Sequence, residues 1–342
     1  MNILMVGPDS HAKGGIATVI ANFEQHFSSE EHQLFFLSSW SEENKYQTEW
    51  QAFCSIRRII REKNIDIVHF HVAQKGSFFR KALLSKMVPK HCRIIFHMHA
   101  SQFDIFYKKS SRFVQALIRR TFNRIDHLVV LGENWAAFYE TLTDTKISIV
   151  QNAVQVPESP SYDDKSQTIV TFGRIGERKG SYDLLQVAAR IEPLFPEVRF
   201  VLYGDGEVEQ IGDQIRSMGL QNVDLGGWLS KEEQAEIFKK TLLHFLPSYH
   251  EGLPMAILET MAVGIPNLTT NVGDIPELIA DGVNGIVTAP GDVDRMADEL
   301  ACFIRNDNNR RSKYSQNAYQ TIANEFSIAA YLVRWEEIYQ SI

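Results

Sequence analysis

Two glutamates, Glu251 and Glu259, offer the most specific chemistry in this sequence of 342 residues. An apolar stretch ends near Pro247, a short loop carries Glu251, and Pro254 is placed to begin a helix. The free N–H groups at the start of such a helix form a site for an anion or a hydroxyl group. A carboxylate early in the helix can accept two hydrogen bonds from a vicinal diol, which ribose and hexoses both present. The pair is therefore typical of a clamp for a nucleotide-linked sugar.

Two other interpretations of the glutamate pair stay open at this point. In the first, Glu251 only caps the helix and Glu259 is solvated. In the second, the two carboxylates are the acid pair of a glycosidase, which requires them to lie across a scissile bond. The cations upstream in the chain bear on this choice.

Two cations flank a glycine-rich stretch that follows a predicted strand in the second half of the chain. Gly173 lets the backbone turn closely, Arg174 presents a planar fork to phosphate oxygens, and Lys179 supplies a mobile point charge before Gly180. Together the cations would neutralise a diphosphate leaving group, which is the main requirement of glycosyl transfer. Two exposed surface cations would show the same spacing, so this stretch alone does not decide the function.

Short apolar runs alternate with segments of helical spacing along the whole chain. The runs expected to be strands in the first half are 3–6, 33–37, 65–71, 93–98, 127–131 and 147–150. Those in the second half are 168–172, 198–203, 242–246, 266–269 and 285–288. This alternation favours the α/β class, with parallel sheets covered by helices on both faces. We therefore expect two Rossmann-like domains that face each other across a cleft.

The expected domain boundaries follow from a polar stretch with two prolines, residues 156–167, which is typical of a linker. We expect an N-terminal, acceptor-side domain over residues 1–155 and a C-terminal, nucleotide-sugar-binding domain over residues 156–325. Residues 326–342 are expected to form a helix that packs back on the first domain. The apolar side chains at helical spacing in that segment are Tyr331, Trp335, Ile338 and Tyr339.

In this order and setting, the motifs resemble those of the retaining glycosyltransferases of family 4, which have the GT-B fold. The residues that carry the resemblance are Gly173-Arg174 with Lys179-Gly180, Gly204-Asp205-Gly206, and Glu251-Gly252 with Glu259 in the spacing E-x7-E. The resemblance covers nearly the whole chain. It implies that Arg174 and Lys179 hold the diphosphate of the sugar donor. It also implies that Glu259 binds the ribose and that Glu251 faces the transferred sugar.

The resemblance assigns the remaining site residues as well. The residues it places at the reacting centre are His99, Arg174, Lys179 and Glu251. Those it places around the sugar donor are Gly14, Gly15, Gly173, Gly204, Trp228, Gly252, Leu253, Pro254, Met255 and Glu259. Gly14 and Gly15 open the first helix, where paired glycines permit close approach of the backbone to a phosphate. Trp228 falls where the family has a residue against the base, and a core aromatic residue is the alternative.

Four histidines end two neighbouring predicted strands in the first half of the chain. His69 and His71 lie on one face of their strand, and His97 and His99 on one face of theirs, because strand side chains alternate. Such pairs can ligate zinc, whereas buried, hydrogen-bonded histidines are the simpler interpretation for the first three. By the resemblance, His99 is the histidine that contacts the transferred sugar, although Ala100 stands where the family usually has glycine.

No metal and no cofactor is expected at the sugar donor. An Asp-x-Asp motif in a suitable setting is missing from the sequence, and Asp292-Val293-Asp294 follows Pro290-Gly291 as the acidic start of a surface helix. We therefore expect Arg174, Lys179 and helix dipoles to neutralise the diphosphate.

The charge of the chain is unevenly distributed. The 35 Lys and Arg residues against 42 Asp and Glu residues give a net charge of -7, which excludes a generally basic nucleic-acid binder. Residues 75–125, however, hold 12 basic side chains and only one acid, Asp104, for a net charge of +11. Apolar residues alternate with these cations, which suits an anionic lipid surface. A solvated domain face is the alternative, and no nucleic-acid recognition module accompanies the charge.

These observations predict a retaining glycosyltransferase that uses a nucleotide-diphosphate sugar. Among such donors a UDP-sugar is the one expected. The expected acceptor is a saccharide, most simply a lipid-linked one in the synthesis of a bacterial surface polysaccharide. Three separated cysteines and the lack of a signal peptide favour the cytoplasm, with reversible docking on the inner face of the membrane. A sugar phosphorylase or nucleotide-sugar epimerase on the same scaffold is the first alternative, and a non-catalytic carbohydrate-binding protein the second.

Overall fold

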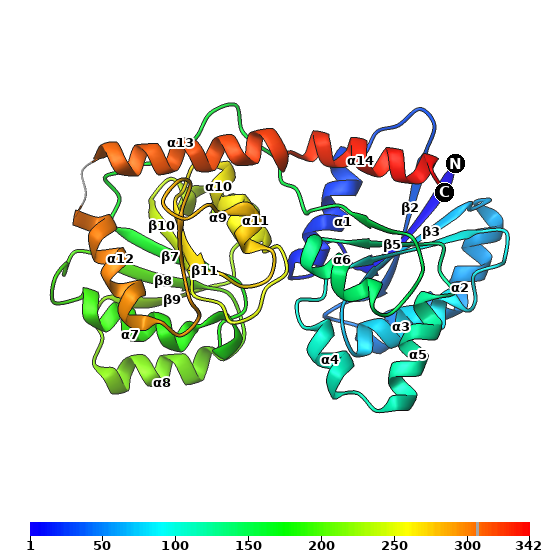
Figure 1. Ribbon diagram of the computed structural model, residues 1–342, viewed down its shortest axis with the longest axis horizontal. Helices are drawn as coiled ribbons and strands as arrows, with labels where there is room; N and C mark the ends of the chain where they lie inside the picture. Colours follow the sequence, from blue (N-terminus) through cyan, green and yellow to red (C-terminus); the bar gives the residue numbers. More distant parts are fainter. Residues whose placement is uncertain (306–307) are drawn as a thin grey trace. The chain divides into compact units, whose positions relative to one another are not determined.

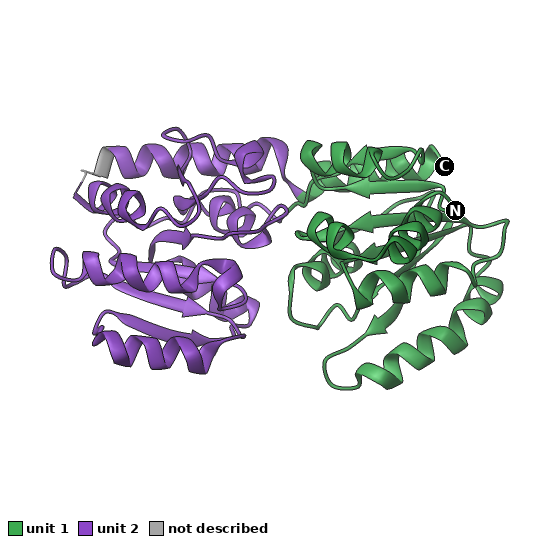
Figure 2. Ribbon diagram, turned by 60° about the horizontal axis from the view of Figure 1, so that its bottom comes forward, with its two compact units in different colours: residues 1–153, 328–342 green, residues 154–327 purple. Residues whose placement is uncertain are grey.

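The computed structural model describes residues 1–305 and 308–342 and divides into two compact units. Unit 1 comprises residues 1–153 and 328–342, and unit 2 comprises residues 154–327 (Figure 1, Figure 2). Each unit contains a six-stranded sheet in which neighbouring strands run parallel. The expected α/β fold with two Rossmann-like units is therefore confirmed.

The sheet of unit 1 has the strand order β2-β1-β3-β4-β5-β6. Its strands are β1 (Asn2–Pro8), β2 (Gln33–Trp40), β3 (Ile67–Val72), β4 (Arg93–Met98), β5 (His127–Val130) and β6 (Ile147–Ile149). Its helices are α1 (Gly15–His26), α2 (Lys45–Glu62), α3 (Gly76–Ser85), α4 (Phe103–Lys109), α5 (Arg112–Phe122), α6 (Glu133–Glu140) and α14 (Ile328–Gln340). The direction of winding reverses between β1 and β3, and ligands of such sheets bind beyond the carboxyl ends of the strands at this reversal.

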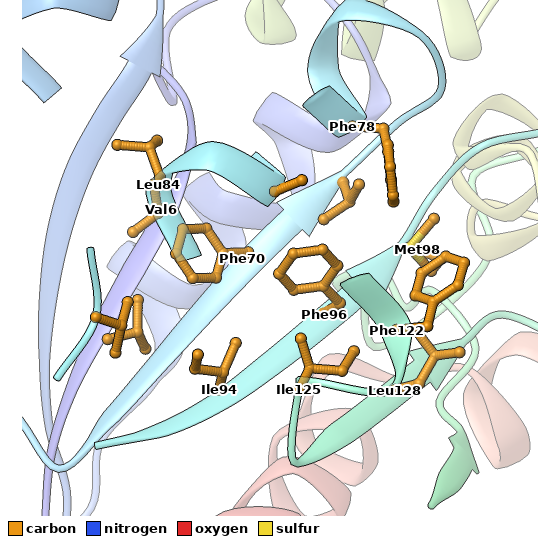
Figure 3. Close-up of a cluster of buried hydrophobic side chains, with 14 of the residues drawn as sticks. Val6, Phe70, Phe78, Leu84, Ile94, Phe96, Met98, Phe122, Ile125 and Leu128 are labelled. Atoms are coloured by element: carbon orange, nitrogen blue, oxygen red, sulfur yellow. The ribbon is translucent and has the colours of Figure 1, made fainter. Parts of the chain in front are cut away.

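The two faces of this sheet are buried in different ways. On one face, Phe70 of β3 and Phe96 of β4 lie in an apolar cluster with Phe78 of α3 and Phe122 of α5 (Figure 3). The neighbouring side chains of β3 and β4 point to the other face, because strand side chains alternate. There they meet Phe23 of α1 together with Tyr331, Trp335 and Tyr339 of α14. The last helix of the chain thus completes the core of unit 1.

The sheet of unit 2 has the strand order β12-β11-β10-β7-β8-β9. Its strands are β7 (Thr168–Phe172), β8 (Arg199–Tyr203), β9 (Val223–Gly227), β10 (Thr241–Leu246), β11 (Asn267–Thr270) and β12 (Ile286–Thr288). Its helical elements are η1 (Glu177–Lys179), α7 (Ser181–Ile191), α8 (Val208–Met218), α9 (Lys231–Phe238), α10 (Met255–Ala262), α11 (Ile275–Leu278), α12 (Val293–Arg305) and α13 (Asn308–Glu325). Winding reverses here between β7 and β10, so the loops after these two strands lie side by side.

Two segments of unit 2 differ from the expectation. Strand β9 was not expected, because it carries only two large apolar side chains, Val223 and Leu225, as an edge strand can. The stretch 156–167, expected as a linker, lies against unit 2, where the Tyr162 hydroxyl donates to the Leu242 carbonyl at 3.0 Å.

Candidate functional site

The candidate site of unit 2 lies where the loop after β7 meets the loop after β10. The backbone N–H of Tyr249 donates to the Arg178 carbonyl at 2.9 Å, which joins the two loops directly. Gly180 has a φ of +70°, and a Cβ atom there would lie 1.9 Å from the Pro247 carbonyl oxygen. Only glycine fits this contact, because any side chain would push the loops apart. The winding reversal of the sheet places the two loops side by side, and Gly180 lets their backbones come into contact.

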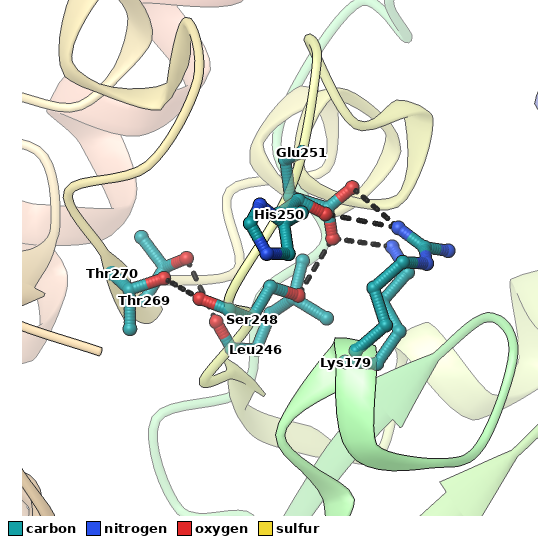
Figure 4. A network of polar contacts seen from close by, with 8 residues as sticks. Lys179, Leu246, Ser248, His250, Glu251, Thr269 and Thr270 are labelled. Atoms are coloured by element: carbon teal, nitrogen blue, oxygen red, sulfur yellow. Dashed lines mark hydrogen bonds and ion pairs between the residues drawn. The ribbon is translucent and has the colours of Figure 1, made fainter. Parts of the chain in front are cut away.

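Glu251 is the centre of a buried polar network at this junction (Figure 4). The ammonium of Lys179 lies 2.5 Å from Oε1 of Glu251, and the Ser248 hydroxyl donates to the same oxygen at 2.6 Å. The side chains of Glu251 and Lys179 are only 6% and 13% exposed. The backbone of Ser248 is fixed in turn, because the Thr270 hydroxyl donates a hydrogen bond to the Ser248 carbonyl at 2.5 Å. The structure thus unites Lys179 and Glu251, which are 72 residues apart in the chain.

A second cation, Arg178, joins the same network and was not expected from the sequence. Its Nη1 donates to the His250 carbonyl at 2.9 Å and lies 3.7 Å from Oε2 of Glu251. Two positive side chains therefore surround one buried carboxylate. Arg174, which was expected beside Lys179, is exposed on the loop after β7 and has no contact with Glu251 among the described contacts.

Glu259 lies in a different environment, on α10. Its Oε2 accepts a hydrogen bond from the Gln234 side chain of α9 at 3.2 Å. Burial raises the pKa of the Glu259 carboxyl, although the bond from Gln234 opposes this shift. Glu259 is thus half-buried and hydrogen-bonded to α9, and its role stays a prediction. Gln234 is a further residue that the sequence pattern did not indicate.

The loops after β7, β8 and β9 are joined by backbone hydrogen bonds. Gly173 donates to the Tyr203 carbonyl at 3.0 Å, and Gly204 donates to the Gly227 carbonyl at 2.8 Å. Trp228 directly follows this junction and is 45% exposed. The alternative of a core aromatic residue is therefore wrong for Trp228, and a role against a nucleotide base stays a prediction.

The remaining expected residues of unit 2 surround the start of α10. Gly252, Leu253, Pro254 and Met255 are all buried, and Pro254 is the residue that directly precedes the helix. The Gly252 carbonyl accepts a hydrogen bond from the backbone of Asp274 at 3.2 Å, which holds the loop in place. The loop and the first turn of α10 are thus part of the same compact junction as Glu251.

In unit 1, the expected residues follow the carboxyl ends of β1 and β4. Gly14 precedes α1 with a φ of +122°, and Gly15 is the first residue of that helix. His99 directly follows β4, and its backbone N–H donates to the Val72 carbonyl at 2.8 Å. Burial, with a smaller effect of the Lys81 ammonium, lowers the pKa of His99 to about 3. Its ring is therefore neutral at physiological pH.

Comparison with known proteins extends these observations to the whole chain. Residues 13–156 match the model of the family described as Glycosyltransferase Family 4, and residues 155–321 match that of Glycosyl transferases group 1. A 2-deoxystreptamine N-acetyl-D-glucosaminyltransferase of Niallia circulans is 25% identical over 271 residues, which are 72% of this chain and 69% of that protein. A UDP-Gal:alpha-D-GlcNAc-diphosphoundecaprenol alpha-1,3-galactosyltransferase of Escherichia coli is 23% identical over 90% of this chain and 83% of that protein. The crystal structure of HepE from Anabaena in complex with UDP-glucose has a TM-score of 0.77 at 17% identity, over 100% of both chains.

Proposed function

Because it carries a family 4 domain followed by a group 1 domain, the chain belongs to the GT-B glycosyltransferases, and we propose that it moves a hexose from a UDP-sugar to a saccharide acceptor with retention of configuration. The observation that carries the proposal is the cluster of Lys179, Arg178 and Glu251 at the winding reversal of unit 2. Nucleotides bind at this place in doubly wound sheets.

The proposed reaction needs positive charge where the diphosphate leaves. The bond from the anomeric carbon to the diphosphate oxygen breaks while the acceptor hydroxyl forms its bond on the same face of the sugar. The hydroxyl proton passes to the departing phosphate oxygen, and UDP is released. Lys179 and Arg174 stabilise the charge that develops on the diphosphate, and Arg178 adds a third cation beside them. No metal ion is required in this scheme.

The other residues are assigned to binding. Glu251 accepts hydrogen bonds from hydroxyls of the transferred sugar, and Glu259 accepts them from the ribose. Trp228 lies against the base, and the loop 252–255 surrounds the sugar with backbone N–H groups. Gly173 and Gly204 let the backbone approach the diphosphate. In unit 1, Gly14, Gly15 and the neutral His99 are assigned to the sugar donor and the transferred sugar.

The choice of UDP rests on two similar proteins, and a thermal-shift experiment tests it. HepE is described with UDP-glucose, and the E. coli relative is described as using UDP-Gal. UDP is expected to raise the unfolding midpoint of this protein more than GDP or ADP at equal concentration, because a ligand that binds only the native state stabilises it. Equal shifts with all three nucleotides would contradict the choice of base. No shift with any of them would contradict the nucleotide site itself.

For the acceptor, we propose a lipid-linked saccharide that is met at the inner face of a bacterial membrane. The E. coli relative is described as acting on a diphosphoundecaprenol-linked sugar. No helix within residues 1–305 and 308–342 is long and apolar enough to cross a membrane. We propose that the basic surface of unit 1 makes the contact with the lipid.

The basic segment 75–125 is only partly available for such contact. Lys81 is buried, Arg80 pairs with Glu49 at 2.6 Å, and Arg93 pairs with Asp126 at 2.9 Å. The end of α4 and the start of α5 carry exposed cations, of which Lys108 also lies 3.5 Å from Asp104. This surface, here named the α4–α5 corner, consists of Lys108, Lys109, Arg112 and Phe113. Phe113 is 79% exposed, so the corner combines cations with an apolar side chain that can enter a lipid headgroup layer.

Reversing two charges at the α4–α5 corner is expected to weaken membrane binding. The double variant Lys108→Glu and Lys109→Glu should bind vesicles with anionic lipid about 30-fold less tightly, since each lost cation contributes about 1 kcal/mol. Vesicle flotation at low salt measures the effect. The matched control is Lys239→Glu with Lys240→Glu, a similar exposed pair in unit 2. If the two double variants float like the original protein, the corner does not dock on lipid.

A further inference from the structure

Three buried histidines lie together on the face of the unit 1 sheet that α14 covers. His69 and His71 project from β3 to the same side, and His97 is the register partner of His71 on β4. All three side chains are fully buried. One ring nitrogen from each lies within 4.8 Å of a ring nitrogen of the other two. Parallel pairing and strand alternation thus bring three imidazoles to one point.

The hydrogen bonds of these rings follow a pattern. Nδ1 of His69 is 2.9 Å from the Tyr339 hydroxyl, and Nδ1 of His71 is 3.1 Å from Nε2 of His99. Within the described part of the chain, Nε2 of His69, Nε2 of His71 and both nitrogens of His97 have no hydrogen-bond partner. Each of the three rings thus keeps at least one nitrogen that could bind a further partner.

Ordinary core packing does not account for these nitrogens. A neutral imidazole has one donor and one acceptor, and a buried polar atom without a partner costs about 1–3 kcal/mol.

We propose that His69, His71 and His97 bind one divalent ion of the zinc class. Zinc binds imidazole nitrogens at about 2.0–2.1 Å, which places nitrogens in a tetrahedral site about 3.3 Å apart. The three ring nitrogens must therefore approach one another by at most about 1.5 Å from their present separation. The fourth position is left for a water molecule, and its ionisation to hydroxide reduces the net charge that is buried.

The contacts around the rings match those of metal-binding histidines. Such histidines commonly donate their second N–H to another protein group, which fixes the tautomer. Here the Nδ1–H of His69 donates to Tyr339 and the Nδ1–H of His71 donates to His99 once both Nε2 atoms hold the ion. Nε2 of His99 is then an acceptor, so its proton lies on Nδ1. The ion would in this way set the donor atom that His99 can present to a substrate hydroxyl.

The ion would also connect elements from the two ends of the chain. Trp335 of α14 stacks on His69 with ring centroids 4.4 Å apart, and Phe23 of α1 meets His69 and His71 edge-on. Binding joins β3 to β4 beneath these aromatic side chains. We therefore expect the ion to stabilise unit 1 and to exchange slowly, because its release requires α14 to move.

The first experiment measures metal in protein that carries no affinity tag. The protein is stripped with a chelator, dialysed against Zn²⁺ and then against metal-free buffer, and analysed by atomic emission. About one zinc ion per chain and a raised unfolding midpoint are expected, since the ion binds the native state. X-ray absorption at the zinc edge should show three imidazole nitrogens at about 2.0 Å. Protein that retains no zinc, or zinc without three imidazole ligands, would overturn the proposal.

A variant pair then assigns the ion to these rings. His97→Phe removes a ligand without breaking any described hydrogen bond, so the metal-free variant should unfold at or above the midpoint of the original protein. Its zinc content should fall at least about tenfold, since only two ligands remain. His244→Phe, at a fully buried histidine of unit 2, is the control and should keep the zinc. Stoichiometric zinc in folded His97→Phe protein would place the ion elsewhere and contradict the site.

Discussion

Replacing Lys179 with methionine is expected to lower kcat/KM for sugar transfer by about 10²–10³-fold, the usual loss when one charge-stabilising group is removed from an active site. Methionine keeps much of the length and volume of the side chain but removes the ammonium. The diphosphate then departs without its nearest cation. The effect should appear both in turnover and in the affinity for UDP, because the proposed mechanism places Lys179 on the diphosphate in both states.

The same substitution should also destabilise unit 2. Glu251 is 6% exposed and would lose the cation that lies 2.5 Å from its Oε1. Leaving one member of a buried ion pair without its partner is costly, although Ser248 and Arg178 still contact Glu251. Activity must therefore be measured on folded protein well below the lowered unfolding midpoint. Lys165→Met, at an exposed position of unit 2, is the control. A Lys179→Met enzyme with more than half of the original kcat/KM would remove Lys179 from the proposed mechanism.

The second large effect is expected from Glu251→Gln, which should separate binding from turnover. Glutamine keeps the shape of the side chain but cannot hold Lys179 by charge. Lys179 is then available to the diphosphate, so UDP should bind as tightly as before or more tightly. Transfer should nevertheless fall about 10²-fold, because the carboxylate that the proposed mechanism assigns to the sugar is lost. Titration with UDP and steady-state kinetics on one preparation measure both quantities.

A double variant connects these two predictions. In the protein with both Lys179→Met and Glu251→Gln, no buried carboxylate is left without its cation. The double variant should therefore be more stable than the Lys179→Met variant alone. Glu236→Gln, at an exposed glutamate of α9, controls for the loss of one acidic group. If UDP affinity falls in Glu251→Gln as much as in Lys179→Met, Glu251 acts on the nucleotide and not on the sugar.

The parts of the fold that were predictable are those set by periodicity. Strands β4 and β7 were expected with the bounds that the structure gives, because each is a short apolar run between polar segments. Edge strand β9 was missed, since one of its faces needs no apolar side chains. The edge strands β2, β6 and β12 were expected all the same, so the scarcity of apolar side chains in β9, and not its edge position alone, explains the miss.

The site was predictable only as a set of motifs. Lys179 and Glu251 were both expected near a sugar donor, but their ion pair depends on sheet order, which spacing along the chain does not contain. Arg178 was overlooked because only Arg174 and Lys179 matched the family motif, yet Arg178 contacts Glu251 together with Lys179, whereas Arg174 has no described contact with it. From the sequence, His69 and His71 could be placed on one face of their strand and His97 and His99 on one face of theirs, but the two strands could not be placed side by side. Their convergence follows from the register of His71 with His97, which is a property of the folded sheet.

The division of the chain also has a consequence for the order in which the protein is made. Unit 1 consists of residues 1–153 and 328–342, so its core is finished by a helix that is translated after the whole of unit 2. At about 5–20 residues per second, the ribosome needs roughly 10–35 seconds to synthesise the 174 residues between the two parts. During that time Phe23 and the histidine face of the sheet lack their cover from Trp335 and Tyr339. The nascent chain therefore presents an apolar surface that chaperones can bind until α14 emerges.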